Sequence, residues 1–301
     1  MMNHNTLIAV DKSGSYRVYL SVSTAMVEEA RRIHGCTPLA AAALGRTITG
    51  AAIMGLMLKS ESDKLTVQFK GDGPAREILA TANAKGEVKG YIADPSVDLP
   101  LKQNGKLDVG GAVRGLGTGS LTVIKDLGLK EPYVGRIELV SGEIAEDLTQ
   151  YYVSSEQQPS SVALGVRMAE DGSVGAAGGM FVQVLPQAQD ECLDKLEETL
   201  FFMDSFTLLV QDAEGDVYRL LDLIFGKMPE EFRPEVLEER DVSWHCDCSR
   251  ERMEKALISI GKKDLCEIIA EDKGAELTCQ FCRKKYRFSE EELIALLKEA
   301  K

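Results

Sequence analysis

The sequence has little histidine and tryptophan, and it lacks the motifs of common enzymes. It contains one tryptophan and three histidines. His4, His34 and His245 form neither an H-E-x-x-H zinc motif nor a Ser-His-Asp arrangement. The glycine-rich stretch "GGAVRGLGTGS" is not followed by Gly-Lys-Ser/Thr, so it is not a Walker loop. We therefore expect no catalytic residues, and the chain is predicted not to be an enzyme.

Long apolar runs and export signals are also missing. No run approaches the roughly 18 apolar residues that span a bilayer. The first residues, "MMNHNTLIAVDKSGSYRVYL", lack a basic leader followed by an apolar stretch. We expect a cytoplasmic protein with no membrane partner. Because thiols are kept reduced in that compartment, clustered cysteines indicate metal ligands or redox groups rather than structural disulfides.

Positive charge is in deficit, with 35 Lys and Arg against 48 Asp and Glu and a net charge of −13. This balance argues against a general nucleic-acid binder, because such proteins neutralise phosphates with basic residues. Residues 190–240 alone carry 15 acidic and 5 basic residues. Repulsion among these carboxylates predicts a segment of marginal stability that depends on its neighbours for packing. The alternative is a solvated helical face with no further role.

The order of the predicted elements favours an α+β fold with a mixed α/β sheet domain at the N-terminus. One helix is predicted to end at Gly35 and the next to begin near Thr37 and Pro38. Residues 63–93 alternate apolar and polar side chains around two turn signals, which predicts a three-stranded meander.

The acidic segment is predicted to be helical. "CLDKLEETLFFMDSF" and "DVYRLLDLIFGKM" both place apolar residues at helical spacing. "MPEEFRPEVLEERDV" then resembles a proline-containing tether. The chain is therefore divided into an N-terminal core domain (1–186), an acidic helical linker (187–240) and a C-terminal zinc domain (241–301).

Four cysteines form two close pairs near the C-terminus. Cys246-x-Cys248 and Cys279-x-x-Cys282 are separated by thirty residues. Two short cysteine pairs that flank a small fold are typical of a tetrahedral Zn²⁺ site, so we predict one zinc ion per chain held by these thiolates. Four thiols already complete the shell, so His245 is assigned a flanking role. Cys36, Cys192 and Cys266 are expected to be buried packing residues.

The predicted zinc site suggests a switch. Structural zinc contributes about 10–16 kcal/mol at neutral pH, which rivals the whole stability of a small domain at about 5–15 kcal/mol. Oxidation that removes the metal is therefore expected to unfold residues 241–288 and to loosen the acidic helices. Apolar residues exposed in this way would bind other proteins; they are Leu193, Leu200, Phe201, Phe206, Leu220, Ile224 and Phe225.

The cysteine stretch "CDCSRER…TCQFCRKKYRF" resembles the zinc module of the 33 kDa chaperonin family, the redox-regulated heat-shock holdases. The resemblance continues through "FKGDGP", "GEIAEDLTQYYVSSEQQPS" and "GAAGGMFVQVLP". It implies an inactive reduced form with zinc bound. It also implies disulfides Cys246–Cys248 and Cys279–Cys282 after oxidation, zinc release and linker unfolding. The active form, usually a homodimer, would hold unfolded or partly folded client proteins without ATP. Cys266 is an additional thiol within the module.

Two other classes of function remain open from the residues alone. The stretch "RKKYRF" after Cys282 is compatible with a zinc-ribbon protein that binds nucleic acid. The Cys279-x-x-Cys282 pair is compatible with a thiol oxidoreductase, but no βαβ pattern surrounds it. The chaperone is the leading hypothesis, and it needs no nucleic acid.

Overall fold

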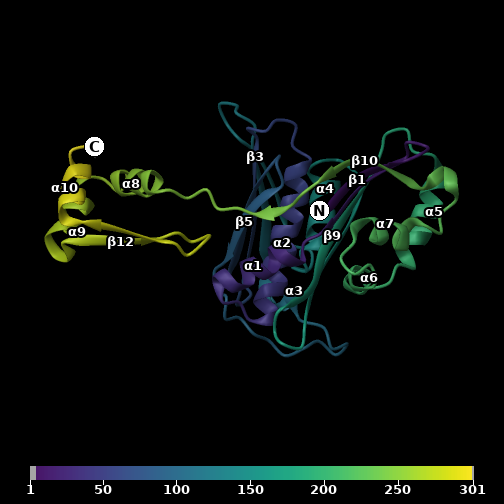
Figure 1. Ribbon diagram of the computed structural model, residues 1–301, viewed down its shortest axis with the longest axis horizontal. Coiled ribbons are helices and arrows are strands. Elements are labelled where there is room, and N and C mark those ends of the chain that lie inside the picture. The colour runs from purple at the N-terminus through teal and green to yellow at the C-terminus, as the bar shows by residue number, and fades with distance from the viewer. Residues whose placement is uncertain (1–4, 300–301) are drawn as a thin grey trace. The chain divides into compact units, whose positions relative to one another are not determined.

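The computed structural model describes residues 5–299, and the chain forms two compact units, 1–245 and 246–301 (Figure 1). The fold is α+β, as predicted. The single boundary after His245 leaves the acidic segment 187–240 inside the first unit. The predicted domain boundary at residue 186 stays a prediction. In the structure the acidic segment packs on the first of the two sheets described next.

Two β-sheets form the centre of the first unit. The first sheet has the strand order β10-β1-β2-β9-β8 and the second has the order β11-β5-β4-β3-β6-β7. The strands of the first sheet are β1 (Thr6–Asp11), β2 (Tyr16–Val22), β8 (Ser160–Met168), β9 (Val174–Val184) and β10 (Pro234–Arg240). Those of the second are β3 (Lys64–Gly71), β4 (Glu77–Asn83), β5 (Glu87–Ile92), β6 (Gly119–Asp126), β7 (Tyr133–Glu138) and β11 (Ser243–Trp244).

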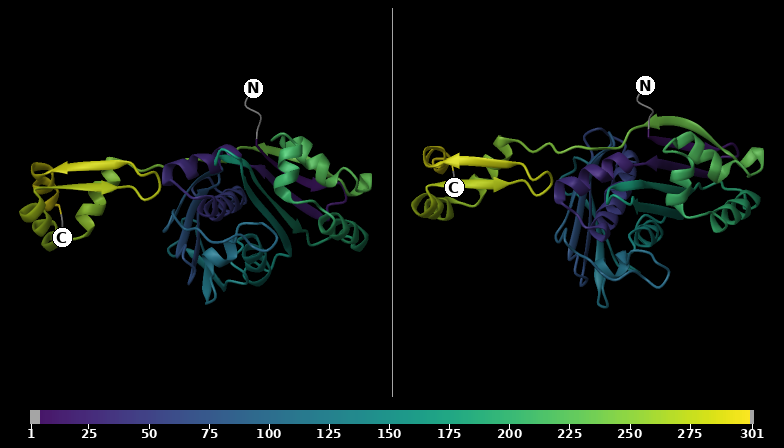
Figure 2. Two further views of the ribbon diagram at one scale, coloured as in Figure 1. Left: turned by 90° about the horizontal axis from the view of Figure 1, so that it is seen from below. Right: turned by 60° about the horizontal axis from the view of Figure 1, so that its bottom comes forward.

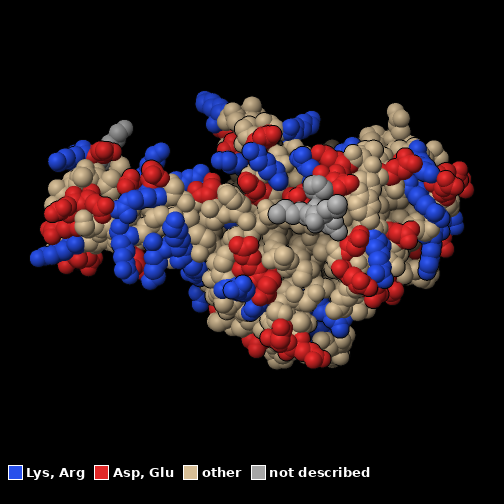
Figure 3. All heavy atoms as spheres, viewed as in Figure 1, with Lys and Arg blue, Asp and Glu red and all other residues tan. Residues whose placement is uncertain are grey.

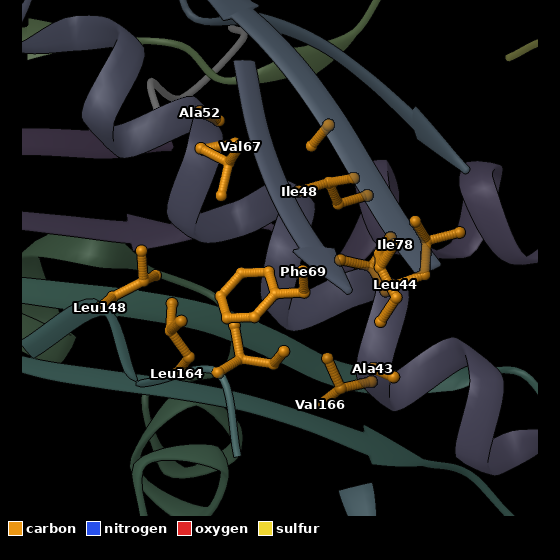
Figure 4. Packing of buried hydrophobic residues seen from close by; sticks show 14 of the residues in the cluster. Ala43, Leu44, Ile48, Ala52, Val67, Phe69, Ile78, Leu148, Leu164 and Val166 are labelled. Carbon is orange, nitrogen blue, oxygen red and sulfur yellow. The ribbon is translucent and has the colours of Figure 1, made fainter. Parts of the chain in front are cut away.

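Helix α2 (Pro38–Leu56) packs against both sheets and supplies much of the core. It begins where the sequence predicted, because the Thr37 hydroxyl accepts a hydrogen bond from the Ala40 N–H. Figure 4 shows Phe69 of β3 among side chains from α2 and the first sheet, including Ile48 and Leu164. The other helices of this region are α1 (Thr24–His34), α3 (Val109–Val113) and α4 (Ala145–Ser154).

Helix α2 is long and apolar enough, by length and composition alone, to cross a membrane. Within the first unit, 94% of the most apolar 18-residue stretch of this helix is buried. A helix that is apolar all round is expected where protein surrounds it on every side, so α2 is a core helix.

The acidic helices cover the face of the first sheet that is turned away from α2 (Figure 2). They are α5 (Asp190–Phe201), α6 (Phe206–Asp212) and α7 (Val217–Phe225), followed by the short 3-10 helix η1 (Glu230–Phe232). Their apolar side chains, such as Leu196, Leu220 and Phe225, form one buried cluster with the sheet. Phe201 was predicted to become exposed only when the acidic helices loosen. Its side chain is already 83% exposed in this structure, so that part of the prediction was wrong.

The predicted tether is also wrong, because residues 234–240 form β10, an edge strand paired antiparallel with β1. β11 then pairs parallel with β5, through Ser243 with Glu87 and Trp244 with Val88. The stretch before the cysteines is therefore integrated into both sheets.

The second unit is small. It contains helices α8 (Arg250–Ser259), α9 (Lys262–Asp272) and α10 (Glu290–Leu297) around the hairpin β12 (Gly274–Thr278) and β13 (Lys285–Ser289). A capping box begins α10, with Ser289 and Glu292 bonded reciprocally. The buried core of this unit consists of Leu257, Leu265, Cys279, Tyr286, Phe288 and Leu293.

Candidate metal centre

Two local structures position the cysteine pairs. Cys246 and Cys248 lie in the extended segment between β11 and α8, and Ser249 caps α8 by accepting a hydrogen bond from the Arg252 N–H. Cys279 and Cys282 lie in the turn that joins β12 to β13. This turn is closed by backbone hydrogen bonds from the Arg283 N–H to the Cys279 carbonyl and from the Cys279 N–H to the Lys284 carbonyl, each 2.9 Å.

The turn brings all four sulfurs together. The Sγ atoms of Cys246, Cys248, Cys279 and Cys282 lie within 4.8 Å of one another. Cys246 Sγ is 3.8 Å from Cys279 Sγ, and Cys248 Sγ is 3.4 Å from Cys282 Sγ. Tetrahedral Zn–S bonds of about 2.3 Å place sulfurs about 3.8 Å apart. The thiol set therefore fits a Zn²⁺ ion in number, chemistry and spacing.

The environment of the thiols changes their acidity in opposite directions. Burial raises the pKa of Cys246 and that of Cys282. Burial also acts to raise the pKa of Cys248, but hydrogen bonds from the Tyr286 hydroxyl and the neighbouring thiols outweigh it and lower this pKa to about 7. In the metal-free protein Cys248 is thus the thiol that ionises most readily among these three.

Tyr286 contacts the thiol cluster, and the sequence did not predict this contact. Its hydroxyl lies 3.1 Å from Cys248 Sγ and 3.1 Å from the Cys248 carbonyl oxygen. Its ring is buried in the core of the second unit. The only sequence signal was a tyrosine in a strand four residues after Cys282. A partner of this kind orients a metal ligand and tunes it.

Basic side chains around the centre are largely engaged in ion pairs. Lys285 and Arg287 both bind Glu276, at 2.7 and 2.8 Å. Arg250 binds Glu292 at 2.6 Å and stacks over the Phe288 ring at 4.3 Å. Figure 3 shows Lys and Arg side chains gathered on the visible face of this unit, interspersed with acidic ones.

The remaining cysteines and His245 lie outside the cluster. Cys36 and Cys192 are buried, as predicted. Cys266 is exposed, so its assignment as a buried packing residue was wrong. It occupies the outer face of α9, while Leu265 beside it is the buried residue. The His245 N–H donates to the Val88 carbonyl, which continues the β11–β5 pairing.

Comparisons with known proteins identify what the chain resembles. A family model described as Hsp33 protein matches residues 5–289. The chain is 48% identical to the 33 kDa chaperonin of Clostridioides difficile (strain 630), over 99% of this chain and 100% of that protein. It is also 48% identical to the 33 kDa chaperonin of Alkaliphilus oremlandii (strain OhILAs), over 99% and 97% of the two chains. The crystal structure of the 33 kDa chaperonin from Thermotoga maritima superposes with a TM-score of 0.87 at 38% identity, covering 99% of both chains.

Proposed function

This chain belongs to the Hsp33 family of chaperones, the 33 kDa chaperonins, and we propose that it is a redox-regulated holdase. The reduced protein with one Zn²⁺ bound is the inactive form. Oxidation of the four cysteines releases the metal and activates the protein. The active protein binds unfolding proteins in the cytoplasm, as a homodimer and without ATP, and prevents their aggregation under oxidative and heat stress.

The observation that carries this proposal is the size of the core around the thiol cluster. Up to residue 299, six residues form the buried core of the second unit, and Cys279 is one of them. Cys246, Cys248 and Cys282 pack against the same core. A core of this size supports little stability alone, and small domains of this kind usually need a metal or a disulfide. Loss of the metal therefore removes a large share of what holds the unit folded.

The redox step balances with peroxide as the oxidant. Each disulfide forms with the loss of two electrons, so the pairs Cys246–Cys248 and Cys279–Cys282 together give up four. Two peroxide molecules take up these electrons with four protons and become water. The disulfide sulfurs no longer supply thiolate ligands for the metal. Each disulfide spans only its own pair, so neither replaces the long connection between the two pairs.

The acidic helices supply the proposed binding surface. Their inner faces contribute apolar side chains to the cluster on the first sheet, among them Phe206, Leu220, Ile224 and Phe225. Once uncovered, this surface is large and apolar, as a surface that binds unfolded proteins must be. The carboxylates on the outer faces keep the opened protein soluble.

The test combines metal release, thiol counting and client protection in one sample. Peroxide at mild heat is expected to release one zinc per chain to a metallochromic dye and to remove four reactive thiols. The same sample should then suppress light scattering by a heat-denatured client. Cys279→Ser should lose zinc binding, while Cys266→Ser should behave as the parent because Cys266 is exposed and outside the cluster. Zinc release without any gain in client protection would contradict the proposal.

The nucleic-acid alternative has less support. Two of the basic residues that suggested it, Lys285 and Arg287, are paired with Glu276, and Lys284 lies over the Tyr286 ring at 5.2 Å. A salt-sensitive affinity of the reduced protein for RNA, lost in a Lys284→Gln and Lys285→Gln variant, would favour that alternative.

A further inference from the structure

A second candidate site lies in the first unit, remote in sequence from the cysteines. It is a pocket of about 610 Å³ where the start of α2, the strand β8, the start of α6 and residues 105–107 meet. Its volume lies within the range of about 300–1,000 Å³ that is typical of small-molecule sites. The large apolar side chains that line it are those of Leu107, Leu164, Val166, Met168, Phe206 and Leu208.

The charge of this pocket is opposite to that of the protein. Arg46, Lys106 and Arg167 line it, and among the described residues of its wall there is no Asp or Glu. This is unusual in a chain with a net charge of −13. Arg46 is already paired with Glu143, so Lys106 and Arg167 are the two cations here that an anionic ligand would neutralise.

These cations also have unused hydrogen-bonding capacity. Within residues 5–299 neither Lys106 nor Arg167 makes an ion pair, and both side chains are exposed at the rim. One guanidinium N–H of Arg46 donates a hydrogen bond to the Glu143 carboxylate at 2.7 Å. Its Nε is buried and has no hydrogen-bond partner among the described residues. Nε of Arg17 and of Arg114 are unpaired in the same way, so this atom supports a ligand here only together with Lys106 and Arg167 beside it in the pocket wall.

We propose that this pocket binds an amphipathic anion, a molecule with a carboxylate or phosphate head and an apolar chain. The head lies at the rim among Lys106, Arg167 and Arg46, where charge-assisted hydrogen bonds are available. The hydroxyls of Ser205 and Thr207, which also line the pocket, add neutral donors. The apolar chain lies against the hydrophobic wall and is removed from water there.

The position of the pocket connects such a ligand to the proposed switch. Part of its wall, Ser205 to Leu208, comes from the acidic segment, while Leu164 and Val166 come from the sheet. A ligand that touches both parts binds only while the acidic helices are docked, so it stabilises the closed form by mass action. This consequence rests on the proposed function, whereas the binding site itself does not.

Binding is tested on the full-length, reduced, zinc-loaded protein by titration calorimetry. The probes are dodecanoate and dodecyl phosphate, each below its micelle concentration. Dodecanol tests the need for the charge, and acetate and inorganic phosphate test the need for the chain. We expect one site per protein for either amphipathic anion, affinity that falls with added salt, and weaker binding of the other three probes.

Variants locate the site. Arg167→Gln and Lys106→Gln should each raise the Kd about threefold, since each removes a partly solvated ion pair, and together they should raise it about tenfold. Lys130→Gln, at an exposed lysine away from the pocket, is the matched control and should leave the Kd unchanged. Far-UV circular dichroism checks that the variants fold alike. Arg46 is not substituted, because its bond to Glu143 also holds the fold.

Several outcomes overturn the proposal. It is wrong if neither amphipathic anion binds, if dodecanol binds as tightly as dodecanoate, or if the two pocket variants bind as well as the control. A separate measurement addresses the switch: saturating dodecanoate should slow peroxide-driven zinc release. Binding without slower release contradicts the coupling alone. Zinc release that never leads to client protection, with or without dodecanoate, contradicts the proposed function and leaves the pocket unaffected.

Discussion

Removal of one hydroxyl, in Tyr286→Phe, should weaken the metal centre without removing a ligand. The ring of Tyr286 is 6% exposed and packs in the core of the second unit. Phenylalanine keeps that ring, so the packing is preserved. The lost group is the hydroxyl 3.1 Å from Cys248 Sγ, which acts on one of the four proposed ligands.

The magnitude follows from the role of that hydroxyl. Loss of a partner that orients a metal ligand typically costs 10–100-fold in metal affinity, or about 1.4–2.7 kcal/mol. The hydroxyl also contacts the Cys248 carbonyl, so one backbone acceptor loses its partner as well. We therefore expect the zinc affinity of Tyr286→Phe to fall within this range, and peroxide to release zinc faster than from the parent.

The assay is competition for zinc against a chelating dye at fixed pH. Tyr133→Phe is the matched control, because it also removes a tyrosine hydroxyl, at an exposed site in the first unit. Equal zinc affinity of Tyr286→Phe and the parent would refute the reasoning. So would an equal loss in Tyr133→Phe, since the effect would then not depend on the contact with Cys248.

Two further predictions concern the first unit. Phe225→Ala should cost about 3–5 kcal/mol of unfolding free energy because this ring is fully buried under the acidic helices, whereas Phe201→Ala, at an exposed ring, should cost little; urea unfolding measures both, and equal costs would contradict the assignment. Burial acts to raise the pKa of Glu143, but hydrogen bonds from Lys102 and Arg46 lower it below its ordinary value of 4.5. The ionised form therefore contributes stability above pH 4.5 that is lost as the pH falls further. Glu143→Gln should be less stable than the parent at neutral pH and should lose less stability on acidification; parallel pH profiles of the two proteins would contradict this.

Local signals in the sequence predicted much of the fold. The αL residue Gly35 and the cap at Thr37 are each decided by a few neighbouring residues. The meander of β3, β4 and β5 is similar, because its alternation and turns lie within one stretch of chain. The cysteine cluster was predictable for a related reason: two short motifs with the right residue type leave few alternatives for a zinc site.

The errors concern contacts between residues far apart in the chain. β10 pairs with β1, whose residues are more than two hundred positions earlier, and most of its side chains are exposed because it is an edge strand. Its sequence, "PEVLEER", is therefore polar and resembles a linker. Tyr286 escaped notice for the same reason, since its contact with Cys248 spans 38 positions. Cys266 shows a smaller limit: its residue type suggested burial, but on α9 the neighbouring Leu265 is the buried residue and Cys266 is exposed.

The misjudged tether changes how the proposed switch has to work. A flexible linker would transmit unfolding at no cost, but β10 and β11 place residues 234–240 and 243–244 in the two sheets of the first unit. Opening must therefore break the pairing of β10 with β1 and lift the acidic helices from a closed apolar cluster. Oxidation of the thiols acts only on the second unit, and each step in the first unit has its own free-energy cost. Mild heat supplies the second contribution, because it lowers the stability of the docked helices. We therefore expect oxidant and heat to act together. An oxidant concentration and a temperature that each leave the protein inactive should activate it when they are combined.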